Sequence, residues 1–146
     1  TSGLFVCRGT SFVKFSSKTQ TTIALSTQES EFYSIVSCVA TGLGLQQLFL
    51  DFGVKVSVAI HSDASAGISL ALRKGLGKAK HICVQWLWVQ QVFASELARL
   101  FKVGTHKNRS DLATKFLDAK RIQYLLGLMG MELRAGRHDL ALDTTG

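Results

Sequence analysis

Apolar residues at the start of the chain come in short runs of the kind that form β-strands. The runs Gly3–Cys7 and Ser11–Phe15 are separated by a short connection that contains Gly9. Two such runs joined by a glycine-containing turn are typical of a β-hairpin. After a polar loop, Thr21–Leu25 is a further candidate for extended backbone.

A long helix is predicted to begin after Ser26. Ser26 and Glu29 have the spacing of a capping box, in which the serine side chain accepts a hydrogen bond from the glutamate backbone. Apolar residues then recur at helical spacing, at Phe32, Val36, Val39 and Leu43. Gly42 and Gly44 are poor helix formers, and we expect them to kink or split this helix.

Strand-like and helix-like segments alternate over the rest of the chain. A period of two predicts a strand that ends at Ser62, with its apolar residues at Val54, Val56, Val58 and Ile60. The other segments are a strand, Leu97–Val103, and the helices Ala64–Leu72, His81–Ala94, Leu112–Leu117 and Ile122–Met129. Strands separated by helices need crossover connections. We therefore predict an α/β or mixed α+β domain over residues 1–130, with a partly parallel sheet, and a disordered tail over residues 131–146.

The chain is basic, with 17 Lys and Arg residues against 10 Asp and Glu, which gives a net charge of +7. Basic side chains displace condensed counterions from phosphates, so this balance favours a nucleic acid partner. Charge alone does not identify a partner, because many basic domains bind no nucleic acid. The candidate contacts lie in two loops and are Arg73, Lys74, Lys78, Lys80, Lys107 and Arg109.

Other features of composition argue against a membrane-bound or secreted protein. No apolar run approaches the ~18 residues that span a bilayer, and the N-terminus lacks a signal-peptide pattern. Cys7, Cys38 and Cys83 are odd in number and lack CxxC spacing, which indicates buried, inert thiols in a reducing compartment, the cytoplasm or the nucleus. No spacing of cysteines and histidines indicates a zinc site.

Three acidic residues are candidates for chemistry. Glu29 is explained by the capping box, whereas Glu31, about 200° further round the helix, has no such duty. Asp63 stands where a strand ends and a helix begins, and sites gather at such places in open α/β sheets. Asp111 stands at the head of a predicted helix. The alternative for both aspartates is an N-cap, a role that Ser110 also suits.

His106 lies on the loop before Asp111 and is within reach of the same place, although a surface position is the alternative. Carboxylates from a first helix and from later element junctions are able to bind divalent metal ions together. Two Mg²⁺ ions held in this way activate water and stabilise the leaving oxygen in phosphodiester hydrolysis.

Five motifs in order give most of the chain a resemblance to a known family. Residues 18–32, K-T-Q-T-T-I-A-L-S-T-Q-E-S-E-F, are similar to the K-x-Q-x-x-V-A-L-S-T-x-E-A-E-Y signature of ribonuclease H domains of copia-type retroelement Pol polyproteins. Thr1-Ser2-Gly3 resembles the family's T-S-G, and residues 61–66 fall where it has C-D-N-x-S-A. Lys80-His81-Ile82 matches its K-H-I, and residues 105–115 follow its turn and D-x-x-T-K pattern.

The resemblance implies a ribonuclease H-like fold, with a mixed five-stranded sheet flanked by helices, and metal-dependent cleavage of RNA in RNA–DNA hybrids. It makes Glu31, Asp63 and Asp111 the ligands of two Mg²⁺ or Mn²⁺ ions, and it places His106 in a loop where related enzymes carry a mobile histidine. The partners it implies are an RNA–DNA hybrid and the preceding reverse transcriptase segment of the polyprotein.

Departures from the family pattern change the expected activity. Ala64 replaces the Asn after Asp63, and Cys83 replaces the Asp after K-H-I. The family's first strand, with its first catalytic aspartate, lies upstream of T-S-G, and residues 1–28 contain no Asp or Glu. Without that central strand two neighbouring strands have unpaired edges, and three acids are left to hold two dications. We therefore expect little or no hydrolysis by these 146 residues alone.

Three hypotheses of different classes follow. The first is a hybrid-cleaving nuclease whose missing strand comes from preceding polyprotein sequence. The second is a catalytically dead retroelement relic that at most binds nucleic acid. The third is a cellular interaction domain.

Overall fold

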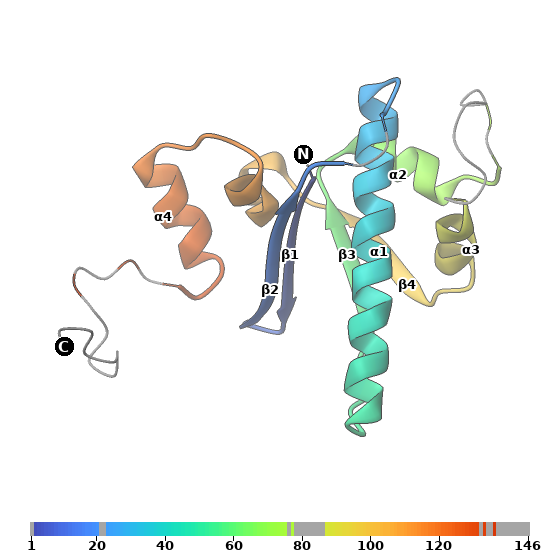
Figure 1. Ribbon diagram of the computed structural model, residues 1–146, viewed down its shortest axis with the longest axis horizontal. Coiled ribbons are helices and arrows are strands. Elements are labelled where there is room, and N and C mark those ends of the chain that lie inside the picture. Colours follow the sequence, from blue (N-terminus) through green and yellow to red (C-terminus); the bar gives the residue numbers. More distant parts are fainter. Residues whose placement is uncertain are drawn as a thin grey trace.

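The computed structural model describes residues 2–20, 23–75, 77, 87–131, 133 and 136. Strands and helices alternate along it, and the predicted mixed α+β class is confirmed (Figure 1). The order is β1 (Ser2–Arg8), β2 (Ser11–Lys18), α1 (Thr27–Asp51), β3 (Val58–Ser62), α2 (Ser65–Leu72), α3 (Trp88–Ala94), β4 (Ala98–Lys102), the 3-10 helices η2 (Thr105–Lys107) and η3 (Arg109–Ala113), and α4 (Ala119–Gly127).

The predicted hairpin is confirmed. β1 and β2 pair antiparallel, with a register shift between Val6 and Cys7 that marks a β-bulge. Gly9 in the turn has φ +59°, a left-handed conformation that glycine adopts at no steric cost. The rings of Phe5 and Phe12 stack across the two strands with 5.7 Å between their centroids.

The start of α1 confirms the capping box, except that the Glu29 side chain accepts from the backbone N–H of Leu25 rather than from that of Ser26. Ser26 Oγ accepts a hydrogen bond from the Glu29 backbone N–H at 3.2 Å. The Glu29 carboxylate accepts from the backbone N–H of Leu25 at 2.7 Å and from the Tyr33 hydroxyl at 2.6 Å. Glu29 is therefore buried with its charge satisfied by the helix start, as its capping role predicts.

The expectation that Gly42 and Gly44 would kink or split α1 is wrong, because Thr27–Asp51 forms one unbroken helix. A Cβ atom at Gly42 would lie 2.7 Å from Cγ1 of Val58, whereas one at Gly44 would meet nothing within 4 Å. Gly42 thus allows α1 to lie unusually close to β3. The helix tolerates the poor propensity of glycine because tertiary packing supplies most of helical stability.

The β3–β4 pair is parallel, with Val58 opposite Ala98 and Ser62 opposite Lys102. The strand predicted from Val54 onward is wrong over residues 54–57, since β3 begins only where its partner β4 begins. The carbonyl of Val56 instead accepts a hydrogen bond from Gln46 Nε2 at 2.7 Å. Residues 23–25, the described part of another predicted extended segment, form no strand.

The core lies between the β3–β4 pair and helices α1, α2 and α3. Helix α1 supplies the largest share of it, and the neighbouring elements supply the rest. The buried core residues are Phe32, Ile35, Val36, Val39, Ile60, Leu70, Ala71, Val89, Val92 and Ala98. By length and composition alone α1 would be able to cross a membrane. Its packing against β3 and α2 is that of a core helix of a globular domain.

In the part of the chain that the structure describes, the strands form two separate two-stranded sheets, β1–β2 and β3–β4. The resemblance implied one five-stranded sheet, which the described residues do not form. Several predicted features lie outside the described residues: residues 81–86 of the predicted helix, the basic residues Lys78 and Lys80, and nearly all of the predicted tail.

The two glycines of α1 provide a matched test of this packing. We expect Gly42→Ala to lower the free energy of unfolding by about 1–3 kcal/mol, because its Cβ overlaps the stiff Val58 side chain. Gly44→Ala, at an open and exposed helical position, is expected to raise it by up to about 1 kcal/mol. Urea denaturation measures both. Equal effects of the two substitutions would contradict the close approach.

Candidate functional site

Two of the three predicted carboxylates lie at the carboxyl end of the β3–β4 pair. Asp63 directly follows β3, and Asp111 lies in η3, which follows β4 and η2. Asn108 joins them: its Nδ2 donates to Asp63 Oδ1 at 2.9 Å, and its carbonyl accepts from the Asp111 backbone N–H at 3.3 Å. Its Oδ1 accepts from the Ser110 backbone N–H at 3.1 Å. Asn108 therefore fixes the position of Asp63 relative to η3.

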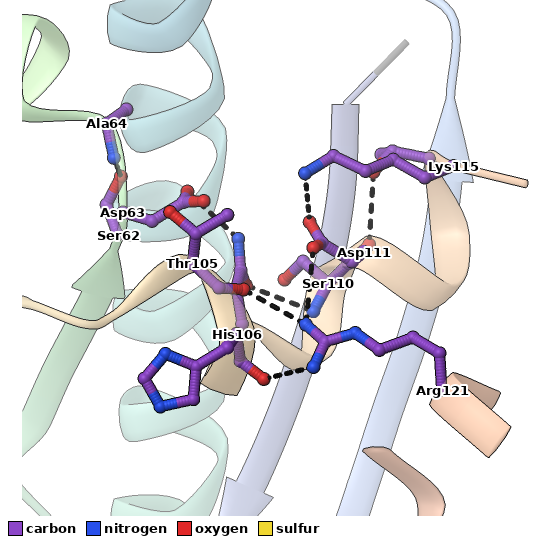
Figure 2. Close-up of polar contacts among 11 residues, drawn as sticks. Ser62, Asp63, Ala64, Thr105, His106, Ser110, Asp111, Lys115 and Arg121 are labelled. Carbon is purple, nitrogen blue, oxygen red and sulfur yellow. Dashed lines mark hydrogen bonds and ion pairs between the residues drawn. The ribbon is translucent and has the colours of Figure 1, made fainter. Parts of the chain in front are cut away.

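Asp111 is a buried carboxylate that faces two cations. Asp111 is only 4% exposed to solvent. Lys115 Nζ lies 2.9 Å from its Oδ1, and the Arg121 guanidinium lies 3.8 Å from its Oδ2 (Figure 2). A buried charge needs partners of this kind, because an unpaired one is costly in a low-dielectric surrounding.

Arg121 also fixes the loop that precedes η3. Its guanidinium donates to the backbone carbonyl of Thr105 at 3.1 Å and to that of His106. Asp118 positions it from the start of α4 by accepting a hydrogen bond from its backbone N–H at 2.7 Å. One arginine from α4 thus holds both η2 and the buried carboxylate of η3.

His106 contributes its backbone rather than its side chain to this arrangement. The residue is exposed, and in Figure 2 its imidazole points away from Asp111. A Cβ atom at Gly104 would lie 3.0 Å from the imidazole ring, so the ring packs beside its own loop. The structure therefore does not bring His106 to the carboxylates.

Glu31 lies on α1, where that helix contacts α2. A Cβ atom at Gly67 would be 2.9 Å from the Cβ of Glu31, so the two helices touch at this point. Gln28, one turn earlier, donates to the carbonyl of Ala66 at 3.2 Å. Because α2 follows Asp63 after a single residue, Glu31 and Asp63 flank the same corner of the fold.

The three carboxylates do not form a ready metal centre. Over the described residues, no group of three or more His, Cys, Asp or Glu side chains lies close enough together to hold a metal ion. Two divalent ions need several converging carboxylate oxygens. Here Lys115 and Arg121 already supply the positive charge that Asp111 requires. The arrangement therefore does not fit the pair of ions that the resemblance implies.

Three residues that contact Asp63 or Asp111 were not predicted as functional, namely Asn108, Lys115 and Arg121. Asn108, rather than Ser110 or Asp111, is the N-cap of η3, and an asparagine just before a helix start is a signal that sequence can give. Lys115 stands four residues after Asp111, which is the spacing of a helical ion pair. Arg121 has no local signal, because its partners come from η2 and η3.

The described basic candidates differ in their surroundings. Lys74 and Lys107 are exposed, as a contact to phosphate requires. The Arg109 guanidinium instead lies 5.7 Å from the centre of the Phe5 ring on β1, turned toward the hairpin. Lys74 and Lys107 are thus the exposed cations among the described candidates, and Lys107 lies beside Asn108.

Comparisons with known proteins point to a retroelement. Over 121 residues, 82% of its length, the chain is 25% identical to the "Retrovirus-related Pol polyprotein from transposon TNT 1-94" of Nicotiana tabacum. The chain spans only 9% of that polyprotein. No family model matches the chain, and no solved structure matches it. The similarity supports a protein derived from retrotransposon Pol.

Substitution of Arg121 tests the cluster against a matched neighbour. We expect Arg121→Met to lower the free energy of unfolding by about 1–3 kcal/mol, because it leaves two carbonyls and a buried carboxylate short of a donor. Lys120→Met, at an exposed position on the same helix, should change it by no more than about 0.5 kcal/mol. Urea denaturation gives both values. Equal losses of stability would contradict the role of Arg121 in holding η2 and Asp111 in place.

Proposed function

We propose that this chain, derived from retrotransposon Pol, is the ribonuclease H-like part of such a polyprotein and binds RNA–DNA hybrids. The observation that carries the proposal is the link from Asp63 through Asn108 to Asp111, at the carboxyl end of a parallel strand pair. The ordered motifs of the sequence support it, because Asp63 and Asp111 fall in two of them. The preceding reverse transcriptase segment of the polyprotein is the partner that we propose beside the hybrid.

Binding of the hybrid would rest on the positive charge of the chain. Its net charge is +7, and both exposed candidates come after Asp63 in the sequence: Lys74 follows α2, and Lys107 precedes η3. Contacts of lysine and arginine to phosphates release counterions, so binding of this kind weakens steeply as salt rises. Such contacts position the backbone of a nucleic acid without reading its bases.

We further propose that the 146 residues bind without cleaving. In the family that the chain resembles, Mg²⁺ or Mn²⁺ supplies activated water and neutralises charge at the phosphate. Here the charge of Asp111 is already compensated by Lys115 and Arg121. A metal ion would have to displace these side chains before it could support hydrolysis at Asp111.

The second candidate function is a relic in which the site has lost its role and only nucleic acid binding is left. The ion pair between Lys115 and Asp111, at 2.9 Å, favours it, because the lysine ammonium already occupies the carboxylate oxygen that a metal ion would need. The two candidates differ in whether Asp111 accepts a divalent ion once that pair is broken.

Binding to a fluorescein-labelled RNA–DNA hybrid, followed by fluorescence anisotropy, tests the proposal. The dissociation constant should rise steeply between 50 and 200 mM salt, as phosphate contacts dictate, by roughly 10-fold or more. Lys107→Ala should weaken binding and reduce the slope against log salt by about 1, whereas Lys14→Ala on β2, outside the candidate set, should leave it unchanged. Absence of binding at low salt would rule the proposal out.

Cleavage is measured in the same mixtures with Mg²⁺ or Mn²⁺ added. We expect no cleavage by the unaltered chain. Cleavage that disappears in Asp63→Asn would show that the 146 residues form a working site and would overturn the binding-only assignment.

Mn²⁺ binding separates the two candidate functions. If Asp63 and Asp111 retain a role as metal ligands, Lys115→Met should bind Mn²⁺ at least several-fold more tightly than the unaltered chain, because it frees a buried carboxylate. The double variant Lys115→Met with Asp111→Asn is the control and should lose that gain. No gain in Lys115→Met, measured by the electron paramagnetic resonance signal of free Mn²⁺, would favour the relic.

A further inference from the structure

One face of the β3–β4 pair packs on the core, and the other face is open to solvent. Along each strand, successive residues point to opposite faces. Ile60 of β3 and Ala98 of β4 belong to the core. The residues that alternate with them are exposed, and we call them the outer face. They form two pairs in the parallel register, Ala59 with Arg99 and His61 with Phe101.

Two aromatic rings stack on the outer face. The centroids of the His61 and Phe101 rings lie 5.3 Å apart, with an angle of 24° between the ring planes. The parallel register places these two residues side by side. Phe101 is nevertheless 44% exposed. A further flat group is therefore able to stack on this pair from the solvent side.

Cations accompany the rings. Arg99 lies two residues before Phe101 on the same face of β4, and its side chain is 70% exposed. The Glu96 carboxylate lies 3.8 Å from its guanidinium and is itself 78% exposed. An exposed ion pair contributes little to stability, so Arg99 is able to exchange this carboxylate for a phosphate.

A second cation lies on the path beyond His61. His61 and the exposed Lys107 line the same groove between β1, α1 and β3. Among the described residues that line this groove there is no Asp or Glu. The surroundings of the rings are therefore complementary to a polyanion.

Rings beside cations fit the chemistry of unpaired nucleotides. Bases stack on aromatic side chains, and arginine and lysine neutralise the phosphates that join them. In a duplex the flat faces of the bases are covered by their neighbours, so a duplex has no base to stack on the rings. An apolar ligand would use the rings alone, and an acidic peptide would use the cations alone.

We propose that the outer face binds single-stranded nucleic acid, with a base stacked on His61 and Phe101 and a phosphate bound by Arg99. The ligand differs from that of the proposed function, because an RNA–DNA hybrid is a duplex. The inference therefore does not rest on hybrid binding, and each of the two is tested separately.

The experiment uses the full 146-residue chain and two fluorescein-labelled DNA decamers, oligothymidine and a decamer of abasic sugars. Both carry the same phosphates, and only the first carries bases. By fluorescence anisotropy, we expect oligothymidine to bind at least about five-fold more tightly, as the stacking of one base requires. An oligouridine RNA decamer should bind within about five-fold of oligothymidine, because neither contact involves the 2′-hydroxyl. Equal binding of the oligothymidine and abasic decamers, or no binding of oligothymidine at about 1 mM, would overturn the proposal.

Substitutions locate the stacking contact. Phe101→Ala should reduce the advantage of oligothymidine over the abasic decamer to less than about two-fold, whereas Phe101→Tyr should keep it because the ring remains. Phe116→Ala, at a fully exposed position between η3 and α4, is the matched control and should also keep it. Arg99→Met should weaken the binding of both decamers by the same factor, because both carry phosphates. An advantage that survives Phe101→Ala would place the stacking elsewhere and contradict the proposal.

Two further measurements keep the test decisive. If Phe101→Ala does not fold, nuclear magnetic resonance of the unaltered chain decides, because the ring current of a stacked base shifts the resonance of the His61 Hε1 proton. Oligothymidine should shift this resonance upfield and the abasic decamer should not; no shift with oligothymidine would overturn the proposal. Phe101→Ala should also leave the affinity for an RNA–DNA hybrid unchanged, so the failure of one proposal does not decide the other.

Discussion

The packing of α1 against its neighbours is the constraint on which the rest of the structure depends. Gly42 brings the helix within van der Waals contact of β3, and Gly67 of α2 brings that helix equally close to α1 at Glu31. At both points a side chain would force the elements apart. The core face of α1 then orders β3, α2 and β4, whereas the hairpin meets the helix at a second face that is only half covered.

Burial of Asp111 sets the electrostatics of the candidate site. A carboxylate that is 4% exposed needs compensating charge, and it obtains this charge from Lys115, one turn later, and from Arg121 on α4. A divalent ion would compete with these side chains for the same oxygens. In this arrangement Asp111 forms a structural ion pair, which a metal ion would have to displace.

The features that sequence predicted correctly are those that depend on near neighbours. The capping box involves Ser26 and Glu29, three residues apart, and the hairpin turn needs only Gly9 between two apolar runs. Asp63 and Asp111 fall in ordered motifs, and Asn108 contacts both in the structure, whereas the role of Glu31, Asp63 and Asp111 as metal ligands stays a prediction. The function of Gly42 was missed because helix propensity does not report that Val58 lies against it. The start of β3 was missed because a strand needs a partner, and β4 begins only opposite Val58.

The groove of about 810 Å³ between β1, α1 and β3 meets the candidate site in three consecutive residues. Lys107 and Arg109 line the groove, and Asn108 between them lines it too and donates to Asp63. Because Asn108 also caps η3, a displacement of its backbone moves both aspartates of the site. The geometry of the candidate site therefore depends on how residues 107–109 pack, because this one segment lines the groove, caps η3 and contacts Asp63.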